Sequence, residues 1–142
     1  DHLDYHKNFK DYFKSKLYLF EKLVKRNSSV ITDIEIPEYK KIKNIALKRK
    51  LDIKTISNQK SSLNIISHKY LEGKQTIEVK YKNKIYIFQT VLIGRIQIKN
   101  ILMAILAAEK SGLKFEKIIT VSIEMTCEVK KWLMIVTVFW FK

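Results

Sequence analysis

Residues 1–20 read Asp1-His2-Leu3-Asp4-Tyr5-His6-Lys7-Asn8-Phe9-Lys10-Asp11-Tyr12-Phe13-Lys14-Ser15-Lys16-Leu17-Tyr18-Leu19-Phe20. From Asn8 to about Arg26 the pattern predicts a helix, and a projection at about 100° per residue gathers its apolar side chains into one stripe. The stripe contains Phe9, Phe13, Phe20 and Val24. Lys16 falls inside it, whereas the other lysines of the segment fall on its flank or the far side. Because burial disfavours a charged ammonium, Lys16 is predicted to become available as an amine for covalent chemistry. The alternative is that its stem covers the edge of the core while the ammonium stays in water.

The loop before this helix is rich in groups that bind cations. Asp1, His2, Asp4 and His6 supply carboxylate and imidazole side chains that can hold a divalent metal ion, with His2 as the natural ligand. A polar turn or a helix cap is the alternative interpretation.

Composition indicates one folded domain. Forty-six per cent of the 142 residues are hydrophobic, which argues against disorder despite a net charge of +14. The positive excess is mostly lysine spread along the chain, so a solvated basic surface is favoured over a specific nucleic-acid platform. The single cysteine, Cys127, excludes an internal disulfide and fits a reducing cytoplasm. The longest apolar run, residues 132–141, is shorter than the about 20 residues of a membrane-spanning helix.

The middle of the chain predicts an α/β fold. Val30-Ile31-Thr32 is typical of a short buried strand, and Pro37 fits the first turn of a helix with Tyr39, Ile42, Ile45 and Ala46 on its inner face. Ile53 and Ile56 alternate with polar residues and indicate a further strand. This strand-helix-strand order is the unit of an α/β sheet.

A small antiparallel meander should follow. Strands are predicted at 63–70, 76–81 and 84–89, with turns at Gly73 and at Lys82-Asn83. His68 lies alone among them and is expected to pack or face solvent. An apolar helix should then run from about Leu92 to a stop at Gly112, followed by a short helix over 113–120. The predicted fold is a mixed sheet with flanking helices.

The opening motif resembles that of the Mur ligase family of peptidoglycan synthesis. Asp1-His2-Leu3-Asp4-Tyr5-His6, followed by Lys16 in a Tyr-x-x-x-Lys-Leu setting, is similar to the branch that adds the third peptide residue to UDP-N-acetylmuramoyl-dipeptide. The resemblance implies that His2 lies at a magnesium site. It also implies that Lys16 is carbamylated, its new carboxylate supporting a second magnesium ion.

Two further segments bear on the resemblance. Residues 94–102 resemble the family's Gly-x-x-Asn-x-x-Asn-Leu segment, which implies that Asn100 contacts adenine, with Gln97 in place of the first asparagine. The Asn-Ala-Asp sequence at the end of a family strand is replaced here by Thr32-Asp33-Ile34-Glu35, which weakens any role for Thr32.

The resemblance covers residues 1–120, the later part of the family's central, ATP-binding domain. Residues 121–142 diverge from the family. Translation in a shifted reading frame would explain this tail, and a divergent β-strand is the alternative. No Gly-x-x-x-x-Gly-Lys-Ser/Thr loop is present to bind ATP phosphates, so the resemblance implies a fragment that is inactive alone.

The complete family enzyme is cytoplasmic. It uses ATP and Mg2+ to join an amino acid to a UDP-N-acetylmuramoyl-peptide, and a complementary N-terminal ligase fragment is an expected partner. The alternatives are a basic module that binds anions or nucleic acid, and a non-functional product of a decayed gene. A salt series of DNA binding would identify the first, and the genomic sequence on both sides of the gene would identify the second.

Overall fold

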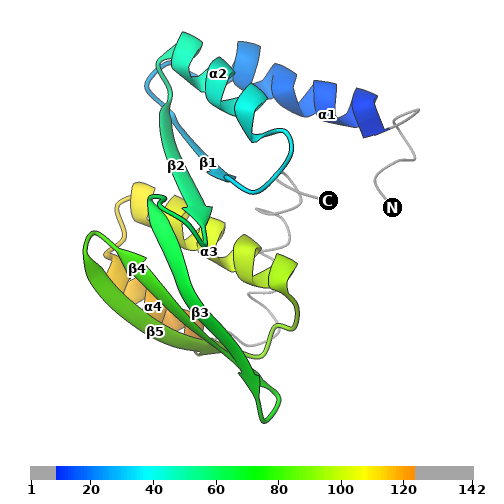
Figure 1. Ribbon diagram of the computed structural model, residues 1–142. Helices are drawn as coiled ribbons and strands as arrows, with labels where there is room; N and C mark the ends of the chain where they lie inside the picture. Colours follow the sequence, from blue (N-terminus) through cyan, green and yellow to red (C-terminus); the bar gives the residue numbers. More distant parts are fainter. Residues whose placement is uncertain (1–8, 124–142) are drawn as a thin grey trace. The chain divides into compact units, whose positions relative to one another are not determined.

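A computed structural model describes residues 9–123 of the chain (Figure 1). Its elements are α1 (Phe9–Tyr18), the π-helical turn η1 (Leu19–Leu23), β1 (Ser29–Asp33), α2 (Tyr39–Arg49), β2 (Asp52–Ser57), β3 (Leu63–Leu71), β4 (Lys74–Tyr81), β5 (Lys84–Thr90), α3 (Arg95–Lys110) and α4 (Phe115–Ile123). The five strands form one mixed sheet in the order β1-β2-β3-β4-β5. The predicted α/β class is therefore confirmed. No helix in the described part of the chain is long and apolar enough to cross a membrane.

The chain divides into two compact units, and the first comprises residues 1–30 and 35–53. Its first helix ends earlier than predicted. After Tyr18 the helix continues as a π turn, in which the Val24 amide donates to the Leu19 carbonyl at 2.9 Å, and the backbone is extended at Val24. The π turn places one extra residue between bonded groups, so the helical spacing assumed for Val24 was wrong.

Helix α2 of the same unit carries the predicted two faces. Ile42 and Ala46 are buried, whereas its lysines, Lys40, Lys41, Lys43 and Lys48, are exposed. The Arg49 guanidinium donates to the Phe20 carbonyl at 2.8 Å, which fastens the end of α2 to the turn η1. Lys50 then adopts a left-handed conformation (φ 56°) that ends the helix before β2.

The second unit, residues 31–34 and 54–142, contains the meander. Strand β3 is parallel to β2, with Ile56 paired to Leu63, and antiparallel to β4. The β4–β5 turn is made by Lys82 and Asn83, both with positive φ, as a two-residue hairpin requires. The predicted strands and turns are confirmed.

The two hairpin strands β4 and β5 use their apolar residues differently. Ile77 and Val79 of β4 are fully buried, but Ile85 and Ile87 of β5 are 59% and 62% exposed. The Lys82-Asn83 turn fixes the register so that Ile85 pairs with the exposed Lys80, and paired residues share a face. Phe88, 1% exposed, fills the inner face of β5 instead.

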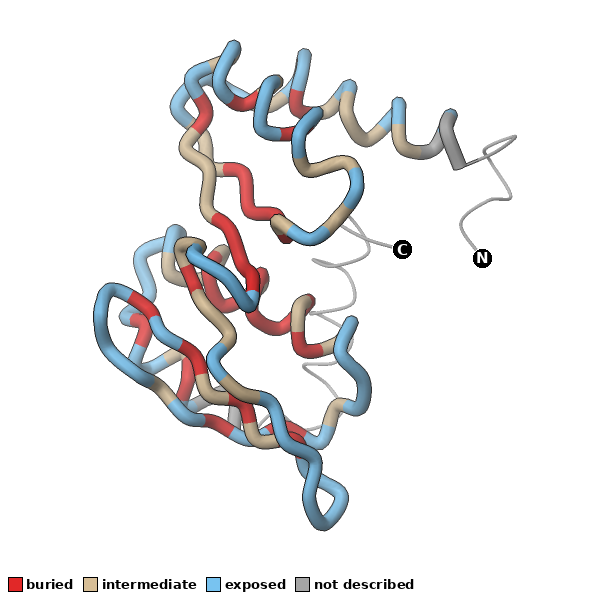
Figure 2. Tube along the Cα trace, in the orientation of Figure 1, coloured by how far each residue is buried: buried red, intermediate tan, exposed pale blue. Residues whose placement is uncertain are grey.

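Helices α3 and α4 cover the inner face of the meander (Figure 1). Figure 2 shows runs of buried residues, and those of α3 belong to the hydrophobic core. The core contains Ile31, Ile56, Leu63, Ile77, Val79, Tyr81, Phe88, Ile98, Ile101, Leu102, Met103, Ile105, Leu106, Phe115 and Ile119. Within it the Phe115 ring stacks on Tyr81 at a centroid distance of 4.3 Å. This core holds α3 in a fixed position against the sheet.

Charged groups fasten the far end of α3 to the β4–β5 turn. The Lys82 ammonium donates to the Glu109 carboxylate at 2.7 Å and holds the pKa of Glu109 below its usual value. Burial, and then the hydrogen bond with Glu109, raise the pKa of Tyr81 above its usual value. A similar bond joins β5 to α4: the Tyr86 hydroxyl donates to the Glu116 carboxylate at 3.0 Å.

Candidate functional site

Lys16 lies in the last turn of α1, and its ammonium nitrogen is shielded from solvent. Lys14 and Lys22 of the same segment are exposed. The structure therefore brings one lysine of this segment to a sheltered position, the one that the helical projection selects. Phe20 is buried and Phe13 is half-buried, so they contribute to the apolar stripe predicted around it.

The predicted metal ligand His2 lies outside the described residues, together with the rest of the Asp1 to His6 loop. Within residues 9–123 no three His, Cys, Asp or Glu side chains gather in a group that could hold a metal ion. The relation between His2 and Lys16 therefore stays a prediction.

The two residues predicted on the adenine side lie on α3. Gln97 is half-buried in the first turn of α3, and Asn100, 9% exposed, is buried in the second turn. The helix begins at Arg95, later than the predicted start near Leu92, and Gly94 (φ 104°) takes the capping position. Gln97 and Asn100 thus lie on one helix that is packed on the sheet.

Strand β1 ends at the position where the family pattern changes. Thr32 is fully buried, and its hydroxyl has no hydrogen-bond partner among the described residues. The adjacent Asp33 bonds instead with α3: the Lys99 ammonium lies 2.5 Å from the Asp33 carboxylate. The ion pair is sheltered, with side-chain exposures of 17% for Lys99 and 4% for Asp33.

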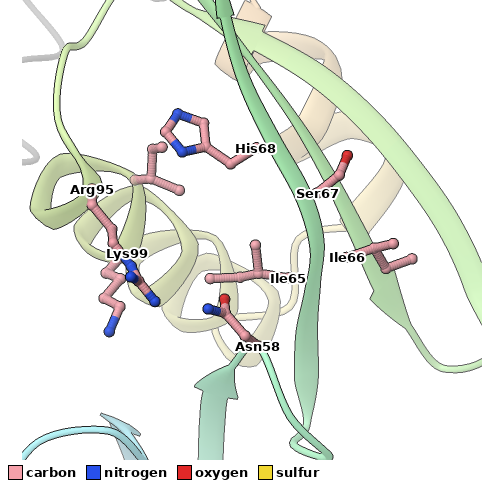
Figure 3. A pocket seen from close by; sticks show the side chains of 8 residues that line it. Asn58, Ile65, Ile66, Ser67, His68, Arg95 and Lys99 are labelled. Atoms are coloured by element: carbon pink, nitrogen blue, oxygen red, sulfur yellow. The ribbon is translucent and has the colours of Figure 1, made fainter.

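A cavity of 330 Å³ opens beside this ion pair (Figure 3). The residues that line it come from the segment after β2, from β3 and from the first turns of α3; they are Asn58, Ile65, Ile66, Ser67, His68, Arg95, Ile98 and Lys99. The described residues of its wall include two basic side chains, Arg95 and Lys99, and none that is acidic. Neither Gln97 nor Asn100 is among them.

His68 reaches this cavity because of a β-bulge. Pairing of β3 with β4 shifts between Ile65 and Ser67, so that His68, and not Ser67, pairs with the buried Ile77 and shares its face. The His68 imidazole bonds with the Gln75 side chain, which in turn donates to the Leu92 carbonyl. Gln75 is buried, so this chain of bonds ties the cavity rim to the segment that leads into α3.

The sequence does not predict the cavity: His68 stands alone among the predicted strands, and no motif includes Arg95 or Lys99 as binding residues. One signal was present: these two cations stand one helical turn apart just after Gly94, where a helix was predicted to begin. The bulge that turns His68 inward has no comparable sequence signal.

Comparison with known proteins gives a consistent result. The family model described as the Mur ligase middle domain matches residues 1–108. A curated protein of Rickettsia montanensis, UDP-N-acetylmuramoyl-L-alanyl-D-glutamate--2,6-diaminopimelate ligase, is 30% identical over 125 residues, which are 88% of this chain and 26% of that protein. The chain therefore spans about a quarter of the length of this relative.

Solved structures share the fold. A UDP-N-acetylmuramoyl-L-alanyl-D-glutamate--2,6-diaminopimelate ligase superposes with a TM-score of 0.75 at 19% identity, over 89% of this chain and 26% of that chain. The MurF ligase of Thermotoga maritima, solved in complex with ADP, superposes with a TM-score of 0.62 at 15% identity, over 80% of this chain and 26% of that chain.

Proposed function

The chain belongs to the Mur ligase family, and from this premise we propose that it is the later part of the middle domain of an ATP-dependent peptidoglycan ligase. The reaction proposed for the complete enzyme is the addition of a third residue to UDP-N-acetylmuramoyl-dipeptide. The name of the Rickettsia relative, a diaminopimelate ligase, supports this branch of the family.

The observation that carries the proposal is the sheltered ammonium of Lys16. A carbamate needs a site sheltered from bulk water, and the Lys16 nitrogen lies in one. As a carbamate, Lys16 would present a carboxylate, and with His2 it would hold magnesium. Bound magnesium would neutralise the charge of a transferring phosphoryl group.

Helix α3 would supply the adenine side. Asn100 and Gln97 both carry amides, which donate and accept hydrogen bonds as the edge of an adenine base requires. The anchoring of α3 by the core and by the Lys99–Asp33 pair supports this role, because a rigid helix positions its side chains more precisely than a loop.

The remaining parts of the proposal concern the whole enzyme. Its substrates would be ATP, a UDP-N-acetylmuramoyl-peptide and an amino acid, in the cytoplasm. The isolated chain would be inactive, because phosphoryl transfer depends on a phosphate-binding loop that this sequence does not contain. A complementary N-terminal ligase fragment would supply that loop.

Base-selective binding tests the proposal. Adenosine and guanosine would be titrated into the isotope-labelled chain and followed by NMR. We expect adenosine to bind with a dissociation constant on the order of 1 mM, guanosine to bind more weakly, and Asn100→Ala to remove the difference. Asn44→Ala, at an exposed position of α2, is the matched control. Equal binding of the two nucleosides, unchanged in Asn100→Ala, would contradict the adenine role.

A further inference from the structure

The cavity at the start of α3 combines cationic and apolar walls, and no residue predicted from the family lines it. We propose that it binds a small organic oxyanion, a carboxylate or a phosphate carried on an apolar body. Arg95 would hold the acidic group, and Ile65 and Ile98 would contact the body. This inference is independent of the adenine role proposed for Asn100.

Charge selects the acidic group. Arg95 is the first residue of α3, a helix of 16 residues, where the helix dipole favours negative charge. Its planar guanidinium matches the two oxygens of a carboxylate or phosphate. Lys99 lies one turn further along, where its ammonium is bound by the Asp33 carboxylate. The direct contact with the acidic group is therefore assigned to Arg95 and not to Lys99.

The rest of the wall selects an apolar body. Ile98, in the first turns of α3, is 2% exposed. Ile65 of β3 packs against the hydrophobic core and lies across the cavity from Arg95 and Lys99 (Figure 3). Asn58 adds a neutral polar group at its margin. The volume of 330 Å³ lies at the lower end of the range of roughly 300–1,000 Å³ found for small-molecule sites, which favours a compact ligand.

The position of the cavity in the sheet supports a binding role. Asn58 directly follows β2, so the cavity lies at the carboxyl end of a parallel strand. Strand β3, which forms the opposite wall, is parallel to β2 but antiparallel to β4. In open α/β sheets ligands bind in the crevice outside the carboxyl ends of the strands.

The test uses the complete 142-residue chain and defined probes. Benzoate, its neutral counterpart benzamide, and acetate, which has almost no apolar body, would each be titrated and followed through the amides of residues 65–68 and 95–99. Phenyl phosphate forms a second arm, and the tighter of the two acids identifies the preferred acidic group. We expect benzoate or phenyl phosphate to bind with a dissociation constant on the order of 1 mM, and benzamide and acetate to bind at least fivefold more weakly.

Variants locate the site. Arg95→Gln should weaken binding of the acid about tenfold, because it removes a charge-assisted hydrogen bond. Lys80→Gln removes a positive charge from an exposed position of β4 and should leave binding unchanged. Urea unfolding of both variants would confirm that the fold is intact. Benzamide binding as tightly as benzoate, equal affinity in Arg95→Gln, or no shifts at these amides would overturn the proposal.

Discussion

The Lys99 ammonium lies 2.5 Å from the Asp33 carboxylate and joins two residues that are 66 positions apart in the sequence. The pair connects α3 to the end of β1, and both side chains are sheltered from water. Loss of one member of such a pair leaves a buried charge without this counter-ion, which costs more free energy than the pair itself contributes.

Lys99→Met should therefore lower the free energy of unfolding by about 2–3 kcal/mol, measured by urea denaturation. The double variant Asp33→Asn with Lys99→Met should lose less than the sum of the two single variants, because no charge is then stranded. Lys114→Met, at an exposed position, serves as the control and should change stability by less than about 0.5 kcal/mol. If the loss of unfolding free energy in the double variant equalled the sum of the two single losses, the Lys99–Asp33 contact would contribute nothing to stability.

Phe115 should be a principal anchor of α4. It is 4% exposed, stacks on Tyr81 at 4.3 Å and meets Tyr86 at 4.8 Å. Phe115→Ala should cost about 3–4 kcal/mol of unfolding free energy through the cavity it creates, and Phe115→Leu should cost less. Leu113→Ala, where the side chain is 58% exposed, is the matched control and should be nearly neutral. A small effect of Phe115→Ala would mean that α4 does not depend on this stack.

The Lys82–Glu109 contact should make stability depend on pH in the acid range. The hydrogen bond from Lys82 lowers the pKa of Glu109 in the folded chain. The stability that this contact contributes is therefore complete above the ordinary glutamate pKa of about 4.3. It is lost as the pH falls through the folded pKa. Glu109→Gln should therefore flatten the fall in stability below about pH 5, whereas Glu72→Gln in the exposed β3–β4 turn should not. Urea unfolding curves recorded from neutral to acid pH measure this dependence. If stability falls identically with pH in Glu109→Gln and in the parent chain, the Lys82–Glu109 contact is not its cause.

The shelter of Lys16 predicts slow chemical modification. When the folded chain is treated with an amine-acetylating reagent and analysed by mass spectrometry, Lys16 should react several-fold more slowly than Lys14, which is exposed on the same helix. In urea the two rates should become equal. In carbon-13-labelled bicarbonate we expect no carbamate signal, because a carbamate persists only when a cation or hydrogen-bond donors offset its desolvation. Equal reactivity of both lysines in the folded state would remove the support for Lys16 as the functional amine.

The isolated chain should not turn over ATP. Positioning of the phosphates accounts for most of phosphoryl-transfer catalysis, and the loop that positions them is not in this sequence. Phosphate release from ATP and magnesium should equal that of a Lys16→Ala variant, both at background. Turnover by the parent chain above the variant would show that the chain completes a catalytic site by itself.

Most helices and strands can be predicted from the sequence because their signals are local. The strands of the meander, the two faces of α2 and the sheltered side of Lys16 all follow from periodicity and turn residues. The features that these local signals do not predict depend on register. The bulge at Ile66 decides where His68 points, and the π turn after Tyr18 displaces Val24. Each shifts a pattern by one residue, which composition and spacing alone do not reveal.

Strand β4 is hydrogen-bonded on both sides, to β3 and to β5, through turns of only a few residues. Contacts this close in sequence form early, since little loop entropy is lost, whereas the contact between Asp33 and Lys99 must close a long loop. In a hydrogen-exchange experiment the amides of β4 around Ile77 and Val79 should therefore be among the last to exchange. The meander would act as the folding nucleus on which α3 and the cavity at its start are assembled.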